Sequence, residues 1–343
     1  MENITENIEE GSNAENGKMS FKKLYFSKLR PVLQILEEDR KEIANQQLTA
    51  MIFAVAGFLT FVAIIGFKLM TSGMAVIISL ILFGIPAAIF FHKYSTAYNV
   101  YKSAFKSKII NSMVKNIDET LTYRENNRIS REQFLASNIF RQRIDRYNGE
   151  DHISGTLDKT AIEFSEVHAE YKTETRDSKG RRQEHWHTIF KGLFFIADFN
   201  KEFAACTVVL PDFAERTFGK FGQTLQEWGN VMNGSELVKL ENAEFEKYFA
   251  VYSYNQIEAR YVLTPLMMEK IVEFRKKVNR DIYLSFNNSK MYLGVPFQEN
   301  LFEPALWSTL LDLVPLEAYY NVMELMVGIV EELNLNTRIW TKE

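Results

Sequence analysis

The sequence predicts an α+β protein: a two-span transmembrane helical hairpin with cytosolic helical arms, followed by a cytosolic domain of antiparallel sheet and helices. Three observations lead to this prediction. They are a long apolar block with one charge, apolar stripes at helical spacing on both sides of it, and alternating strands in the second half of the chain. We therefore expect a disordered acidic leader over 1–20, the hairpin over 21–121 and the cytosolic α+β domain over 122–343.

The apolar block extends from Leu48 to Phe91, and Lys68 is its only charged residue. It divides into two runs, residues 48–67 and 74–91, which contain 20 and 18 residues. At about 1.5 Å per residue, each run is long enough to cross a hydrocarbon core of about 30 Å. Core helices of soluble proteins rarely continue this far without a charge, so the lipid bilayer is the expected partner of both runs.

Basic residues near the two runs predict the topology. Six Lys or Arg residues lie between Lys22 and Lys41 and four Lys between Lys93 and Lys108, whereas the connecting loop carries only Lys68. The positive-inside rule then places both termini in the cytoplasm. The first 20 residues contain five Glu and one Lys, unlike the basic start of a signal peptide. A single cysteine, Cys206, suits a domain on the reducing side of the membrane.

Both spans are expected to continue into the cytosol as helices. A stripe begins at Tyr25 before the first span, with Pro31 allowed in the first turn of a helix, and another runs from Tyr94 to Leu121 after the second span. The two arms can pack together as a stalk, and the alternative is a helix that lies flat on anionic lipid. Within the bilayer, close packing is expected of small residues, and Pro86 is a candidate for a kink. Ala50, Ala54 and Gly57 of the first span are expected to meet Gly84 and Ala88 of the second.

Strands dominate after about residue 126. The runs "ISGTL", "AIEFSEVHAEY", "HTIFKGLFFIADF" and "FAACTVVLP" are separated by short connections or a charged loop, which predicts an antiparallel meander. Later, "RDIYLSFNNSKMYLGVPF" predicts a hairpin that pairs Phe286 with Met291 and places Ile282 opposite Val295. Helices are expected around 264–278 and 315–332. Glu324 interrupts the second of these, so we expect it to pack in the domain and not to span the membrane.

The best candidate site contains His168, His185 and His187, with Glu166 or Glu170 as a further ligand. Residues two apart on a strand point the same way, so two imidazoles could converge on one zinc ion. Convergence depends on the register across the loop 172–183. With its centre near Lys179, His187 opposes Tyr171 and His168 opposes Phe190, which leaves His168 and His187 about three residues apart along the strands. H-x-H is a weak metal signal, and hydrogen-bonded histidines on a polar sheet face are the commoner case.

Other chemistry has little support in the sequence. There is no G-x-x-x-x-G-K-[ST], no strand-linked G-x-G-x-x-G and no G-x-S-x-G. Cys206 lies in the apolar strand "AACTVVL", which is typical of an inert core thiol. The net charge of −4 equals that of the acidic leader, so the rest of the chain is neutral and no nucleic acid partner is expected. We assign no catalytic residue and no cofactor.

Several motifs together resemble a known family. "RQRIDRYNGEDHISG", "FSEVHAEY", "HWHTIFKGLFFIADFNK", "LVKLENAEFEKYFAVYS", "QIEARYVLTP" and "GIVEELNLNTRIW" are similar to the bacterial membrane-protein family called domain of unknown function 3137. The resemblance extends from the arm before the first span to Trp340. It implies a two-span protein of the bacterial cytoplasmic membrane with a cytosolic C-terminal domain. It implies no established activity and supplies no catalytic residues.

Three functional hypotheses follow. The preferred one is a membrane-anchored cytosolic binding or scaffold module that recognises an unidentified protein and could form a homo-oligomer. The alternative is a metal-dependent hydrolase at the inner membrane surface that acts through His168, His185 and His187. The third is a pore or transporter subunit, although Lys68 lies at the loop and not at mid-bilayer, where functional charges mark pathways. A non-enzymatic role is preferred.

Overall fold

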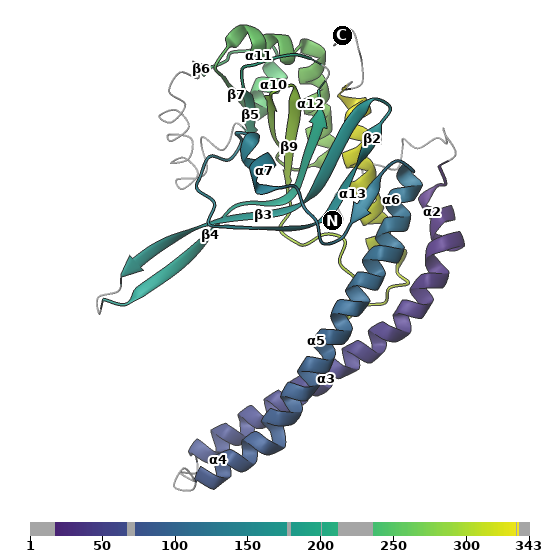
Figure 1. Ribbon diagram of the computed structural model, residues 1–343, viewed down its shortest axis with the longest axis vertical. Coiled ribbons are helices and arrows are strands. Elements are labelled where there is room, and N and C mark those ends of the chain that lie inside the picture. The colour runs from purple at the N-terminus through teal and green to yellow at the C-terminus, as the bar shows by residue number, and fades with distance from the viewer. Residues whose placement is uncertain are drawn as a thin grey trace. The chain divides into compact units, whose positions relative to one another are not determined.

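The computed structural model describes residues 18–66, 73–176, 180–199, 201–211, 236–333 and 335 (Figure 1). Most of the acidic leader, the loop with Lys68, the centre of the charged loop near Lys179 and the tail with Trp340 lie outside the described residues. The described chain forms two compact units. The hairpin unit contains Met19–Met113 and Phe302–Leu316, and the sheet unit contains Val114–Leu301 and the chain from Glu317 onward.

Two long helical stretches form the hairpin unit. The first consists of α2 (Phe21–Leu24), η1 (Tyr25–Leu29) and α3 (Arg30–Gly66). The second begins with α4 (Gly73–Ser79), η3 (Leu80–Gly84), α5 (Ile85–Phe105) and η4 (Lys106–Ile110), and α6 (Asn111–Ile117) continues it into the sheet unit. η1, η3 and η4 are single π-helical turns.

Pro31 and Pro86 each lie two residues after a π-helical turn, η1 or η3. A proline lacks the N–H that an α-helix needs, and a local wide turn accommodates it without breaking the helix. The first helical stretch begins at Phe21. Pro31 therefore follows a helix that has already formed and does not open one.

The apolar runs coincide with exposed helix surface. Two helical stretches, Phe21–Ile65 and Met74–Ile117, are long and apolar enough to cross a membrane, and their most apolar windows are 6% and 0% buried. The helix α13 (Leu313–Glu332) also reaches this length and hydropathy, but 56% of its window is buried inside the protein. The first two helices are thus the candidate spans, and α13 packs in the protein.

The two candidate spans pack closely at small side chains. A Cβ atom added to Gly57 would lie 3.0 Å from the Cβ of Phe83, so the absence of a side chain permits this approach. The Thr60 and Ser79 hydroxyls hydrogen-bond at 2.8 Å, and the ring of Phe53 stacks on that of Phe90. Gly57 therefore packs against Phe83, and not against the expected partners Gly84 and Ala88.

Residues 302–316, here called the strap, lie against both helical stretches of the hairpin unit. Their backbone carbonyls accept hydrogen bonds from Tyr25, Arg40 and Tyr101, at 2.6–2.8 Å. The Leu310 N–H donates to Glu37 at 2.9 Å. Side chains of these two helical stretches thus hold a segment that is distant in sequence.

Among the described residues, the sheet unit forms a nine-stranded antiparallel sheet in the order β1-β2-β3-β4-β9-β8-β5-β7-β6. Its edge strands are short, which limits unwanted edge pairing. The strands are β1 (Thr122–Arg124), β2 (Arg146–Leu157), β3 (Thr160–Arg176), β4 (Arg182–Asp198), β5 (Thr207–Pro211), β6 (Glu236–Leu237), β7 (Phe249–Ser253), β8 (Tyr283–Asn287) and β9 (Lys290–Pro296).

The expected meander holds for β2, β3 and β4 and then ends. β4 pairs with β9, whereas β5 lies between β8 and β7. The prediction that "FAACTVVLP" follows β4 in the sheet was wrong, because the late hairpin occupies that position. Within this hairpin the predicted register is confirmed at Phe286↔Met291 and Leu284↔Leu293, and Ile282 lies just before β8.

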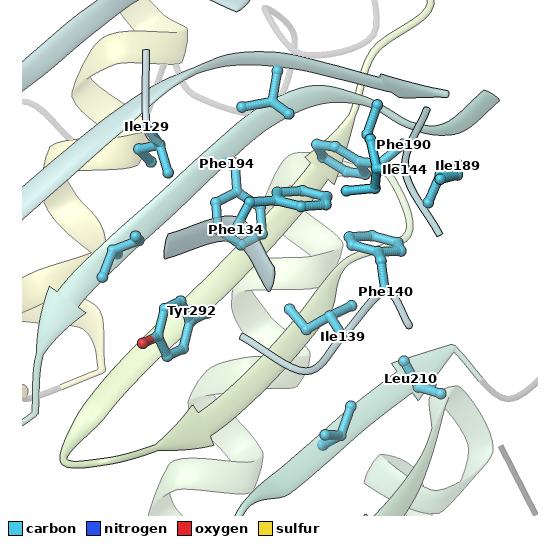
Figure 2. Packing of buried hydrophobic residues seen from close by; sticks show 14 of the residues in the cluster. Ile129, Phe134, Ile139, Phe140, Ile144, Ile189, Phe190, Phe194, Leu210 and Tyr292 are labelled. Atoms are coloured by element: carbon cyan, nitrogen blue, oxygen red, sulfur yellow. The ribbon is translucent and has the colours of Figure 1, made fainter. Parts of the chain in front are cut away.

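One face of the sheet packs beneath α7 (Arg131–Ala136), which begins at a capping box of Ser130 and Gln133. Phe134 of this helix lies among the rings of Phe140, Phe190 and Phe194, as Figure 2 shows. The other described helices are α10 (Ala243–Tyr248), α11 (Gln256–Val262), α12 (Pro265–Val278) and α13. Both of the later helices predicted from the sequence are confirmed, as α12 and α13.

Candidate functional site

The register of β3 and β4 decides whether the three histidines can meet. Arg176 pairs with Arg182 and Tyr171 with His187, so the hairpin is centred at position 179, as predicted. Farther along, Ala169 pairs with Phe190 and Glu170 with Thr188, which leaves Ile189 as a one-residue bulge. His168 therefore opposes Lys191, and the predicted pairing of His168 with Phe190 was wrong.

The histidines lie on two different faces of the sheet. His185 and His187 hydrogen-bond to Thr175 and Thr173, at 3.1 and 2.9 Å, and His187 also stacks on Tyr171. These β3 partners have odd numbers, and side chains alternate between faces along a strand. His168 lies on the even-numbered face, 3.5 Å from Thr188 and 3.7 Å from Glu170. Three imidazoles divided in this way do not converge on one ion.

Beyond the body of the sheet, β3 and β4 continue as a two-stranded projection, here called the arm (residues 171–176 and 182–187; Figure 1). Among the described residues, no third strand pairs with it, because β2 pairing ends at Glu170 and β9 pairing ends at Gly192. Most of its side chains are exposed. Much of the region predicted to be a loop, residues 172–183, thus belongs to strands.

An aromatic and ionic cluster holds the base of the arm. The Arg146 guanidinium lies 3.7 Å from the centre of the Trp186 ring, and it bonds to Glu170 at 3.2 Å. On the same face, Lys172 contacts Glu184 at 2.8 Å, and this hydrogen bond raises the pKa of Lys172. The two faces of the arm therefore differ: one carries charges and Trp186, and the other carries histidines, threonines and Tyr171.

His168 lines a cavity of about 270 Å³ in the sheet unit. Burial lowers the pKa of His168, which favours the neutral form of its imidazole. Glu166 is only 9% exposed, and it accepts a hydrogen bond from the Leu301 N–H at 2.8 Å. Polar groups that line the cavity include Asn126, Asn148, Glu150, Glu166, Lys191 and Glu299.

Of the described residues, one group places three possible metal ligands together: Glu150, Asp151 and Glu166, with ligand atoms within 4.8 Å of one another. Glu166 was among the residues singled out in the sequence, but Glu150 and Asp151 were not. In sequence, "NGED" has the composition of a turn. In the structure it lies within β2, where a bulge places Asp151 at φ 60° and Tyr123 bonds to its carboxylate. Carboxylates are the ligands that hard cations prefer, although exposed or clustered acids alone do not assign an ion.

Residues 188–335 match the family model DUF3137, described as a protein of unknown function. The predicted resemblance to this family is thus confirmed over less than half of the chain. The DUF3137 match begins one residue after His187, so all three histidines and both candidate spans lie outside it. The resemblance was expected to extend from the helix before the first span to Trp340, and the region that matches the family model is shorter.

Other comparisons add little. No curated protein matches the sequence. Among solved structures, the crystal structure of the mycobacterial trehalose monomycolate transport factor A, TtfA, aligns with 65% of this chain and 92% of that chain. The TM-score is 0.32 and the sequence identity is 8%. A likeness this distant assigns neither a fold nor a function to the chain.

Proposed function

We propose that this protein is a membrane-anchored binding module: two helices anchor it in a bacterial cytoplasmic membrane, and its cytosolic sheet unit recognises a protein partner. The observation that carries this proposal is the exposed apolar surface of residues 48–65 and 74–91 in a chain that also contains a folded sheet unit. Large apolar surfaces of this kind are stable only against lipid or another protein. The distribution of Lys and Arg supports cytoplasmic termini.

The arm is the element of the sheet unit best suited to a partner. A two-stranded ribbon that pairs with no further strand among the described residues is marginal on its own. Apart from the Lys172 N–H, which donates to Asp145, its edges offer backbone groups for β-sheet pairing with another chain. Trp186 supplies an aromatic side chain of the kind enriched at protein interfaces. The hydrolase hypothesis, in contrast, loses its geometric basis because the three histidines lie on two faces.

Site-directed thiol labelling tests the topology. In a Cys206→Ala background, an impermeant maleimide should modify a Lys68→Cys variant in intact cells. It should modify a Thr175→Cys variant, whose native side chain is exposed, only after permeabilisation. The reverse pattern would place the sheet unit outside the cell and would contradict the proposed location. Labelling of both variants in intact cells would contradict it equally.

Shortening the arm tests the binding role. Lys172 and Trp186 are cross-strand partners, so Asn-Gly can replace residues 173–185 and close a two-residue hairpin between them. We expect the variant to remain in the membrane fraction and to lose a cross-linked partner that the full chain retains. A cross-linking pattern identical to that of the full chain would show that the arm does not bind the partner.

A further inference from the structure

The contacts of the strap show in which direction it runs along the hairpin unit. On the second helical stretch, Glu303 contacts the amino groups of Lys102 and Lys106 at 2.8 and 3.0 Å. The Ala305 carbonyl accepts a hydrogen bond from Tyr101 at 2.8 Å. Tyr101 precedes both lysines and is therefore nearer to the candidate span that ends at residue 91. The strap thus approaches the spans as it passes from Glu303 to Ala305.

On the first helical stretch the strap runs away from the spans. The Leu306 carbonyl accepts a hydrogen bond from Arg40 at 2.6 Å, and the Leu311 carbonyl accepts one from Tyr25 at 2.8 Å. Arg40 is nearer than Tyr25 to the candidate span that begins at residue 48. The strap therefore reverses direction just after Leu306. This bend, residues 306–309 and here called the apex, is the part of the strap closest to the spans.

The apex exposes an indole ring and no charged side chain. Trp307 is 62% exposed, and Ser308 and Thr309 beside it are exposed as well. Trp favours the boundary between hydrocarbon and water, because its ring is apolar and its N–H donates a hydrogen bond. An uncharged bend with an exposed Trp therefore suits the head-group layer of a bilayer.

A row of aromatic rings connects the end of the second span with the strap. The rings of Phe91, Tyr94, Tyr98 and Tyr101 follow one another with centroids 5.8–6.1 Å apart. The last ring in the row carries the hydroxyl that donates to Ala305. Tyr, like Trp, is enriched where a membrane protein passes through the interface. The helix surface between the span and the apex thus has the composition of an interfacial belt.

The apex also lies at a suitable height along the hairpin unit. Arg40 is eight residues before Leu48, which corresponds to about 12 Å along a helix. The polar layer on each side of the hydrocarbon core is about 5–8 Å thick. Trp307 directly follows Leu306, the residue bound to Arg40, and an indole side chain is long enough to bridge the remaining few ångströms.

We propose that the apex is a lipid-contacting surface, with Trp307 inserted in the head-group layer of the bilayer around the spans. This inference rests on the membrane anchoring proposed above. Trp307 fixes the depth of the hairpin unit in the bilayer, as interfacial aromatic residues do. Arg40 and Tyr101 hold the apex to the two helical stretches, so the anchor acts on the hairpin unit as a whole.

Quenching of fluorescence by brominated lipid tests this contact in the full-length protein, reconstituted in vesicles of phosphatidylcholine and phosphatidylglycerol. Trp186→Phe, Trp228→Phe and Trp340→Phe together leave Trp307 as the only indole. We expect lipid brominated near the glycerol to remove about half of its emission, and lipid brominated near the chain end to remove less than about a fifth. Equal emission in brominated and unbrominated vesicles would overturn the proposal.

Two controls start from the same chain with Trp307→Phe added. Val314→Trp places the probe beyond Leu311, at the other end of the strap, where the native side chain is 58% exposed. It should keep its emission, and quenching equal to that of Trp307 would overturn the role of the apex. Leu82→Trp places the probe within the second span and should be quenched. Quenching of Leu82→Trp without quenching of Trp307 would overturn this inference and leave the proposed anchoring intact, whereas an unquenched Leu82→Trp would overturn both.

A nitroxide label makes the test independent of the Phe substitutions. In a Cys206→Ala background, Trp307→Cys and Val314→Cys carry the label in turn, and the other native tryptophans remain. Electron paramagnetic resonance then compares collisions of the label with oxygen, which concentrates in lipid, and with a water-soluble nickel chelate. We expect the ratio of oxygen to nickel collisions to be about threefold higher at position 307 than at position 314. Equal ratios at the two positions would overturn the proposal.

Discussion

Gly149 lines the cavity, and its lack of a side chain permits the close approach of the β2 and β3 backbones. A Cβ atom added there would lie 2.2 Å from the carbonyl oxygen of Glu166 and 3.1 Å from the Arg128 side chain. Gly328, within α13, has no such neighbour within 4 Å. We expect Gly149→Ala to lower the free energy of unfolding by about 3 kcal/mol because the β2–β3 backbones must separate. Gly328→Ala should raise it by about 0.5–1 kcal/mol by restricting the unfolded chain.

Urea unfolding of the full-length protein in detergent measures both effects as shifts of the midpoint. The two variants have the same chemical change, so opposite shifts isolate the role of the backbone approach at Gly149. Equal destabilisation by both would contradict it.

At the same scale, the alternation of polar and apolar residues along β3 indicates which way its side chains point. Val167 and Ala169 do belong to the buried cluster, whereas Glu166 and His168 line the cavity on the other face. The bulge at Ile189 was not predictable from the sequence, because one extra apolar residue does not change the pattern of an apolar run. The acidic group at Glu150 and Asp151 was missed for a related reason: turn composition concealed a bulged strand.

At the scale of elements, the arm is expected to be energetically separate from the rest of the sheet. Residues 171–176 and 182–187 pair with one another, and most of their side chains are exposed. Replacing residues 173–185 by Asn-Gly retains the Trp186–Arg146 contact at the base. We expect the free energy of unfolding of the sheet unit, obtained from its urea midpoint, to change by less than about 0.5 kcal/mol.

As a control, Arg146→Ala removes the contact with Trp186 and the bond to Glu170, and it should destabilise the full chain by about 1–2 kcal/mol. A shortened chain that lost more stability than Arg146→Ala would show that the arm supports the fold and is not only an appendage.

Local pairings were predictable and distant ones were not. The β8–β9 register followed from matching apolar residues across a four-residue turn sequence, so Phe286↔Met291 was found. The insertion of β9 beside β4 joins segments about 100 residues apart, which periodicity does not encode. The strap is the same kind of case, because Glu303 and its lysines are separated by about 200 residues.

For the whole molecule, the candidate spans were evident from composition because lipid imposes a simple requirement: a long run without charge. The boundaries of the units were less evident. The chain enters the hairpin unit twice, first over Met19–Met113 and again over Phe302–Leu316. Composition alone did not reveal this return, since the strap has neither the length nor the hydropathy of a span.

The two units should unfold separately in urea when the protein is in lipid bilayers. Helices in lipid keep their backbone hydrogen bonds because no water replaces them there, so the hairpin unit should retain its helical signal.

Cys206 is buried in the sheet unit, and burial raises the pKa of its thiol to about 11. At pH 8 the folded thiol is therefore protonated and inaccessible, whereas the unfolded thiol reacts with a maleimide. We expect Cys206 labelling to reach its midpoint at a lower urea concentration than the loss of far-ultraviolet helical signal. Cys206→Ala provides the background, and coincident transitions would mean that the two units unfold as one cooperative structure.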